Sequence, residues 1–215
     1  MKFTLLSPTP ATLQAMAKTW EKHIEKTGFD PGDLETAWQV LAQRKRFLPK
    51  QGLLGETRLL DQLLKESFRA DQATANGSSL AFLAEYAGKS ALLLGDAHPH
   101  VVTASLRRLC TERCVPSLLV DVVKLAHHGR KNNTDAALLA TLNYPRYLVS
   151  TSGAQFGHPD RACMERVVKL GHARELIFNY RSEFTLPWIA ASTQRRYGYE
   201  ARVRSNKGLS IVTSL

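Results

Sequence analysis

Residues 79–96, SLAFLAEYAGKSALLLGD, contain two apolar strand-like runs joined by Ala87-Gly88-Lys89. Short apolar runs on either side of such a turn predict a β-hairpin. Beyond residue 98, helical segments alternate with strand-like runs, namely VDVVKLA, RYLVSTSG, RELIFNY and GLSIVTSL. This alternation predicts an α/β fold, a mixed β-sheet with helices packed on it.

The first 75 residues differ from this pattern, and we divide the chain into an N-terminal helical segment with an irregular insertion, 1–75, and a second region, 76–215. After a short strand at KFTLL, one helical stripe carries Leu13, Met16, Trp20 and Ile24. A second helix is expected from Asp33 to Leu41. Both stripes are interpreted as packing surfaces. From about residue 44 to residue 79 the pattern becomes irregular, with a short leucine-rich helix near residues 59–64.

The composition is that of a basic globular protein. Its hydrophobic content is 44%, and 29 Lys and Arg against 19 Asp and Glu give a formal net charge of +10. This charge favours anionic partners such as phosphate esters or nucleic acid. Apolar runs fall far short of the roughly 20 residues of a membrane span, so we expect a cytoplasmic protein without membrane contact. The odd cysteine count, without a CxxC pair, indicates neither a disulfide framework nor a cysteine zinc site.

Three loops place ligand-capable side chains directly after apolar strands. Asp96 ends the first, His127 and His128 precede Gly129 in the second, and the third, YLVSTSGAQFGHPD, contains His158. Open α/β sheets commonly build their sites at strand ends. A carboxylate with imidazoles suits zinc, manganese or iron. Adjacent imidazoles are poorly explained by packing, because successive side chains diverge.

These three segments, in order over about residues 76–177, resemble the second half of the metallo-β-lactamase superfamily. The similar branch contains the hydrolase domain of the DNA-uptake channel protein and stand-alone bacterial relatives. Its members show a strand ending in Gly-Asp, a strand ending in HHGS, and a serine and glycine loop leading to Gly-His-Pro. This chain has Arg130 in place of the serine after HHG. The resemblance implies the C-terminal half of an αββα sandwich. It also implies metal-assisted hydrolysis, of phosphodiesters or another anionic ester, with two zinc ions in the complete site.

Carried over by position, the resemblance assigns metal binding to Asp96, which would bridge two ions, and to His128, which matches the last histidine ligand. His127 would then face the substrate or serve as the alternative ligand. His158 matches a loop histidine aimed at the substrate, so His127 and His158 are the catalytic candidates. His98 and His100 match no ligand position and are expected to be exposed residues at a helix start.

The main departure from the family is the absence of a whole metal-binding segment, which matters more than any single substitution. The HxHxDH segment that supplies most metal ligands is absent, since the single H-x-H, His98-Pro99-His100, continues with Val101. One carboxylate and one or two histidines should hold metal weakly. We therefore expect a truncated, split or degenerate hydrolase, inactive alone. Its partner would be a separate N-terminal half or a second copy that covers the apolar sheet face of LLLGD and VVKLA.

The alternative is a non-catalytic, basic nucleic-acid-binding module derived from the same fold. Aromatic and basic residues near the C-terminus could stack on bases and contact phosphates. They are Phe178, Tyr180, Arg181, Arg195, Arg196, Tyr197 and Tyr199. A steep loss of nucleic-acid binding with rising salt concentration would favour this binding module. Metal in the purified protein would instead favour the hydrolase.

Overall fold

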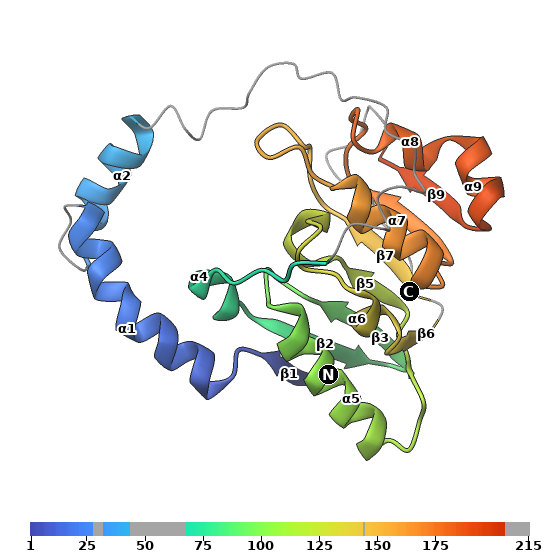
Figure 1. Ribbon diagram of the computed structural model, residues 1–215, viewed down its shortest axis with the longest axis horizontal. Coiled ribbons are helices and arrows are strands. Elements are labelled where there is room, and N and C mark those ends of the chain that lie inside the picture. The colour runs from blue at the N-terminus through green and yellow to red at the C-terminus, as the bar shows by residue number, and fades with distance from the viewer. Residues whose placement is uncertain (28–31, 44–67, 144, 205–215) are drawn as a thin grey trace.

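A computed structural model describes residues 1–27, 32–43, 68–143 and 145–204 (Figure 1). Within them a seven-stranded sheet has the order β1-β2-β3-β5-β7-β8-β9, and a second sheet pairs β4 with β6. Antiparallel and parallel pairs occur in the larger sheet, and helices pack on it. The predicted α/β class with a mixed sheet is confirmed.

The sheet begins with an antiparallel meander. β1 (Lys2–Ser7) pairs with β2 (Ala81–Tyr86), which pairs with β3 (Lys89–Leu93). At the predicted hairpin turn Ala87 and Gly88 have φ of 48° and 74°. Two central residues with positive φ match the right-handed twist of the flanking strands, which explains the tight connection. The chain's first strand thus belongs to the same sheet as the later ones.

The remaining strands run parallel to β3. Their order across the sheet is β5 (Val122–Lys124), β7 (Arg146–Val149), β8 (Glu175–Phe178) and β9 (Glu200–Val203). The smaller parallel pair is β4 (Leu118–Leu119) with β6 (Leu142–Asn143). β9 was not predicted, because its short sequence, EARV, alternates charged and small side chains and lacks an apolar run.

Helices connect the parallel strands, as the alternation predicted. They are α5 (Pro99–Glu112), α6 (Ala136–Leu139), α7 (Arg161–Leu170), α8 (Leu186–Ile189) and α9 (Ala191–Tyr197). Local chemistry fixes their starts: Pro99 occupies the first turn of α5, and the Asp135 carboxylate accepts from Leu138 N at 2.8 Å to cap α6. The N-terminal region adds α1 (Pro10–Thr27), α2 (Leu34–Gln43) and the short α4 (Thr74–Gly77).

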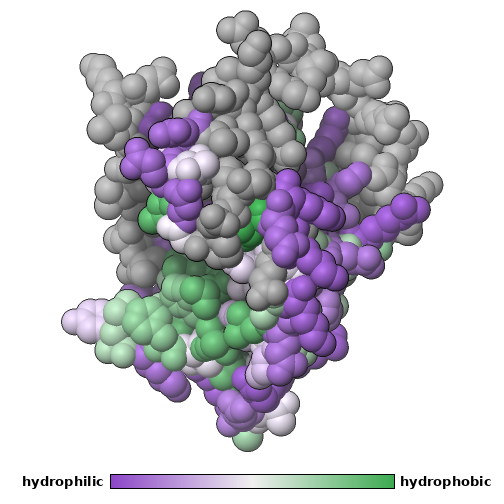
Figure 2. Space-filling model, turned by 90° about the vertical axis from the view of Figure 1, so that its left-hand side faces the viewer, coloured by the Kyte–Doolittle hydropathy of each residue, from purple (hydrophilic) through white to green (hydrophobic). Residues whose placement is uncertain are grey.

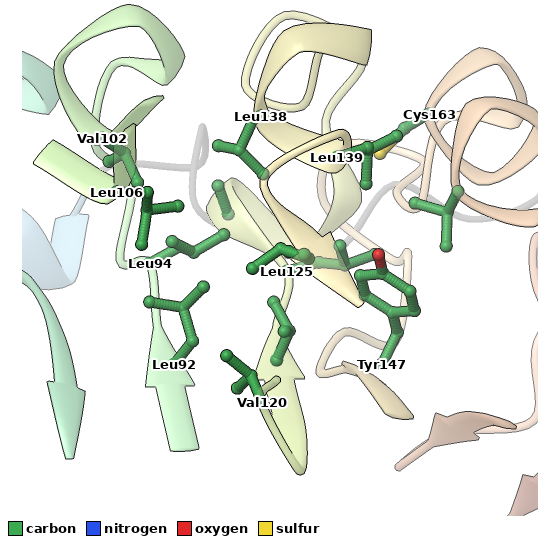
Figure 3. Close-up of a cluster of buried hydrophobic side chains, with 14 of the residues drawn as sticks. Leu92, Leu94, Val102, Leu106, Val120, Leu125, Leu138, Leu139, Tyr147 and Cys163 are labelled. Carbon is green, nitrogen blue, oxygen red and sulfur yellow. The ribbon is translucent and has the colours of Figure 1, made fainter. Parts of the chain in front are cut away.

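The hydrophobic core lies between the sheet and helices α5, α6 and α7 (Figure 3). Leu106 of α5 and Leu139 of α6 are fully buried against strand residues such as Leu92 and Tyr147. The Tyr147 hydroxyl donates to Gly171 O at 2.9 Å, so this buried polar group is satisfied.

Two packing expectations differ from the structure. Leu92, Leu94, Val123 and Leu125, from the runs expected to offer an open apolar face, are 0% exposed because helices cover them, whereas Leu93, which alternates to the other face, is half-buried. Conversely, the α1 and α2 stripes are open at several positions. Leu13 is 50% exposed, Trp20 51% and Trp38 70%. Both helices extend away from the sheet in Figure 1, so within the described ranges these side chains lack the packing surface that periodicity implied.

The predicted leucine-rich helix near residues 59–64 and the strand GLSIVTSL lie outside the described residues. Among the helices that the structure describes, none is both long and apolar enough to cross a membrane.

Candidate functional site

The candidate side chains gather at one edge of the sheet. β3, β5 and β7 are parallel, so their carboxyl ends meet there. Asp96 follows β3, the histidine pair follows β5, and His158 lies in the loop after β7. The His127 ring centroid is 6.3 Å from that of His128 and 6.0 Å from that of His158. The His127 backbone N–H donates to Gly95 O at 2.8 Å, which joins the first two loops.

The histidine pair lies in an unusual backbone conformation. His127, His128 and Gly129, within the 3-10 turn Ala126–Gly129, have φ of 44°, 59° and 84°. Left-handed backbone at a residue other than glycine costs about 1–3 kcal/mol and is concentrated at functional sites. The turn sets the two imidazole planes 78° apart, so the rings face different neighbours. A Cβ at position 129 would lie 2.8 Å from Pro159 Cβ, so glycine is required there.

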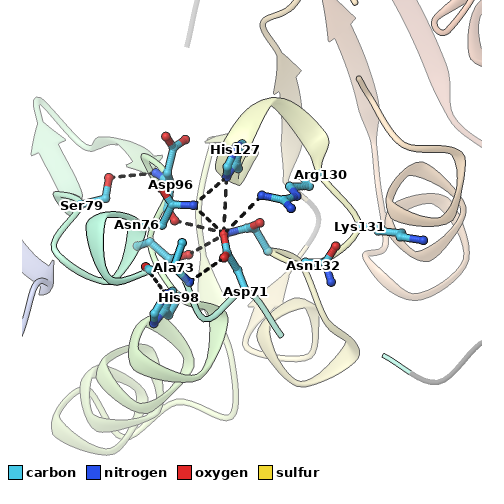
Figure 4. A network of polar contacts seen from close by, with 12 residues as sticks. Asp71, Ala73, Asn76, Ser79, Asp96, His98, His127, Arg130, Lys131 and Asn132 are labelled. Atoms are coloured by element: carbon cyan, nitrogen blue, oxygen red, sulfur yellow. Dashed lines mark hydrogen bonds and ion pairs between the residues drawn. The ribbon is translucent and has the colours of Figure 1, made fainter. Parts of the chain in front are cut away.

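A buried carboxylate that the sequence did not single out lies at the centre of this edge (Figure 4). Asp71 is 7% exposed, and its Oδ1 accepts from Ala73 N at 3.0 Å. Its Oδ2 accepts from Asn76 Nδ2 at 2.7 Å and from Asn133 Nδ2 at 3.1 Å. Arg130 Nη1 lies 3.8 Å from the same oxygen. Asp71 therefore joins the segment before β2 to the loop after β5.

Two further contacts fix the position of Asp96. Its backbone N–H donates to Ser79 Oγ at 2.9 Å, and its carbonyl accepts from Asn133 Nδ2 at 3.2 Å. The preceding Gly95 has φ of 52°, and a Cβ there would lie 2.5 Å from Leu80 O. Gly95 is thus a structural requirement of this loop, whereas both contacts of Asp96 are made by its backbone.

The other two candidate histidines, His128 and His158, each have a hydrogen-bond acceptor close to their Nδ1 atom. His128 is exposed, and its Nδ1 lies 2.6 Å from Ser150 O. His158 is 8% exposed, and its Nδ1 lies 3.3 Å from Asp160 Oδ1. Each contact orients its imidazole, the arrangement by which proteins commonly fix a histidine for ligation or proton transfer.

The charges at this edge shift several pKa values. Burial lowers the pKa of His127, and the charges of Arg130 and His158 act in the same direction, against the carboxylates Asp96 and Asp71. Burial alone would raise the pKa of Asp71, but hydrogen bonds from Ala73, Asn76 and Asn133 outweigh it and lower the pKa.

A lysine lies close to Asp96 as well. Burial lowers the pKa of Lys124, which the charge of Asp96 opposes, and Lys124 Nζ donates to Leu125 O at 2.9 Å. The edge therefore combines carboxylates with partly desolvated cations.

These residues supply only part of a metal-binding shell. Within the described ranges, no group of three or more His, Cys, Asp or Glu side chains is arranged to hold a metal ion. Asp96 and the histidines have the donor chemistry for zinc, manganese or iron, but a closed zinc site takes four ligands. The described residues alone do not fit the dinuclear centre that the resemblance implies.

His98 is placed differently from the expectation. It is 9% exposed rather than open to solvent, and its Nε2 lies 3.0 Å from Ala73 O. A Cβ at Gly77 would approach its ring to 2.9 Å, so the imidazole packs on α4. The expectation was wrong for His98 because residues 73–77 fold over the start of α5. His100 is exposed, as expected.

Two of the seven aromatic and basic residues named near the C-terminus are buried. Phe178 is 0% and Tyr199 5% exposed, and Tyr199 donates its hydroxyl proton to Trp188 O at 2.7 Å. Arg204 lies over the Tyr180 ring at 4.8 Å. Phe178 and Tyr199 would have to leave the core to stack on a base, whereas Tyr180, Arg181, Arg195 and Arg196 are exposed.

Comparisons with protein-family models, with curated proteins and with solved structures find no match for this chain.

Proposed function

We propose that this chain is the C-terminal portion of a metallo-β-lactamase-fold hydrolase that acts on a phosphodiester or another anionic ester. The observation that supports this most is the gathering of Asp96, the His127-His128 pair and His158 at the carboxyl ends of three neighbouring parallel strands. Three independent loops supply these side chains. Packing requirements alone do not account for three imidazoles and a carboxylate at one edge.

In this proposal Asp96 and His128 are metal ligands, while His127 and His158 face the substrate. Zinc bound in a complete site would supply an activated water with a pKa of about 7. Because the described residues do not complete a shell, the remaining ligands would come from outside the described ranges, and a separate N-terminal half bearing HxHxDH would supply them. The net charge of +10 favours an anionic substrate.

A completing segment would also have hydrophobic surface to cover. Phe3 and Leu5 of the edge strand β1 are 60% and 54% exposed, although Phe3 packs edge-on against Phe82 with ring centroids 5.5 Å apart. Figure 2 shows a hydrophobic surface, drawn in green, on the side of the molecule from which α1 and α2 extend. A separate half or a second copy of this chain would bury such a surface.

Hydrolysis of bis-p-nitrophenyl phosphate tests the proposal. The purified chain with added zinc or manganese should show no metal-dependent turnover. Co-expression with a segment bearing HxHxDH, sought in the DNA adjoining this reading frame, should produce turnover. Asp96→Asn in the assembled protein should abolish it, because a carboxylate ligand would be replaced by a neutral amide.

His100→Ala is the matched control and should leave turnover within about twofold of the unmodified assembly, since that imidazole is exposed and outside the network. His98→Ala is unsuitable, because His98 is buried and hydrogen-bonded. Zinc-dependent turnover by the purified chain alone, lost in Asp96→Asn, would show that another set of residues completes the site. A metal-loaded assembly without turnover on any anionic ester would contradict hydrolysis.

A further inference from the structure

His127 and His128 are adjacent in sequence, but their Nδ1 atoms contact different groups: Asn76 Nδ2 for His127 and Ser150 O for His128. Asn76 Nδ2 lies 2.7 Å from Asp71 Oδ2. Asp71 also accepts hydrogen bonds from Ala73 N and Asn133 Nδ2, so it acts as a carboxylate acceptor. An acceptor requires the amide nitrogen of Asn76, not its oxygen, on this side. Asp71 therefore fixes the orientation of the Asn76 amide.

The same amide nitrogen faces His127. Asn76 Nδ2 lies 3.3 Å from His127 Nδ1, whereas Asp71 Oδ2 lies 3.6 Å from that ring nitrogen, beyond normal hydrogen-bond distance. An amide nitrogen has two protons and no acceptor capacity. One proton goes to Asp71 and the other points to His127. His127 Nδ1 must then be the acceptor, which places the proton of the neutral imidazole on Nε2.

The two neighbouring histidines have the opposite arrangement. Ser150 O and Asp160 Oδ1, which contact Nδ1 of His128 and His158, can only accept. Those imidazoles therefore carry their proton on Nδ1 and keep the lone pair on Nε2. A metal ion binds a nitrogen lone pair, so His128 is prepared for ligation through Nε2 and His127 is not.

We infer that Asn76, oriented by Asp71, is a positioning residue that holds His127 as an Nε2–H hydrogen-bond donor toward an anionic substrate oxygen. This role rests on the proposed function, but the tautomer itself does not. Arg130, whose guanidinium lies 3.8 Å from Asp71, adds a cationic donor beside this neutral one. Under the proposed function, His128 would then be the metal ligand and His127 the group that contacts the substrate.

Histidine tautomers are read directly by long-range ¹H–¹⁵N correlation spectra of the full chain labelled with ¹⁵N-histidine. The spectra are recorded at pH 8 with a chelator, and the signals are assigned with His127→Gln, His128→Gln and His158→Gln. We expect the Nε2–H pattern for His127 and the Nδ1–H pattern for His128 and His158. Asn76→Ala should remove the Nε2–H preference of His127, because Asp71 then becomes its nearest polar neighbour.

Asn132→Ala is the matched control, since the Asn132 amide donates to Arg69 O and leaves His127 untouched. It should preserve all three patterns. An Nδ1–H pattern for His127 in the unmodified chain would overturn the inference even if Asn76→Ala failed to fold, as would an unchanged His127 pattern in a folded Asn76→Ala protein. The spectra need neither substrate nor a completing segment, so a failure of hydrolysis would leave the tautomer result intact.

Discussion

The core beneath α5, α6 and α7 and the polar network around Asp71 are both buried, yet different forces hold them. In the core, apolar side chains such as Leu106 and Leu139 lose solvent contact without needing a particular partner. In the network, Asp71 is matched to Ala73, Asn76 and Asn133 by directional hydrogen bonds. Substituting a core residue should therefore remove apolar packing contacts. Substituting a network residue should leave buried hydrogen-bond donors without an acceptor.

The largest effect is expected in the core. Leu106→Ala should destabilise the protein by about 2–5 kcal/mol, because Leu106 is 0% exposed and its removal leaves a cavity under α5. Urea unfolding followed by circular dichroism measures the change. Leu119→Ala makes the same substitution at a side chain that is 77% exposed and should cost no more than about 0.5 kcal/mol. Equal losses in the two variants would mean that the core is misassigned.

A substitution in the polar network should lower the free energy of unfolding by less than the core substitution. Asp71→Ala should cost about 1–3 kcal/mol, the penalty for buried donors left without an acceptor. Glu112→Ala, at an exposed carboxylate 3.4 Å from Arg108, should change stability by less than about 0.5 kcal/mol. Urea unfolding of both variants compares the two stability changes. An Asp71→Ala protein as stable as the parent would argue against a structural role for the network.

Low pH should reduce the stability that the Asp71 carboxylate contributes to the folded protein. Hydrogen bonds lower its pKa in the folded state against the effect of burial. A carboxylate with a lowered folded-state pKa contributes stability above its unfolded value, about 3.9, and loses it as the pH falls through the folded value. The stability difference between the parent and Asp71→Asn should be constant from about pH 5 to 7 and narrow below about pH 4. A difference that widens in acid would reverse the sign of this linkage.

The same contrast explains what the sequence could predict. The hairpin at Ala87-Gly88, α5 and α7 follow from local turn chemistry and periodicity, which adjacent residues determine. The strand-end positions of Asp96 and the histidine pair followed from the same patterns. Neither turn chemistry nor periodicity can predict the contact between Asp71 and Asn133, which are 62 residues apart in the sequence.

Local patterns also do not say what an element packs against. Asp71 and Asn76 lie in the polar stretch ADQATANGSS, which has no periodicity, and the burial of His98 depends on that stretch folding over α5. The α1 stripe shows the converse, since its period predicts the helix correctly but not the exposure of Trp20. Tertiary contacts decide both cases.

Zinc stoichiometry tests the central claim, that these residues form only part of a dinuclear site, most directly. The purified chain is loaded with zinc, challenged with a chelator, and its retained metal is measured by mass spectrometry, beside Asp96→Asn and His100→Ala. We predict fewer than two zinc ions per chain, a further loss in Asp96→Asn, and no change in His100→Ala. Two tightly retained zinc ions per chain would contradict the account.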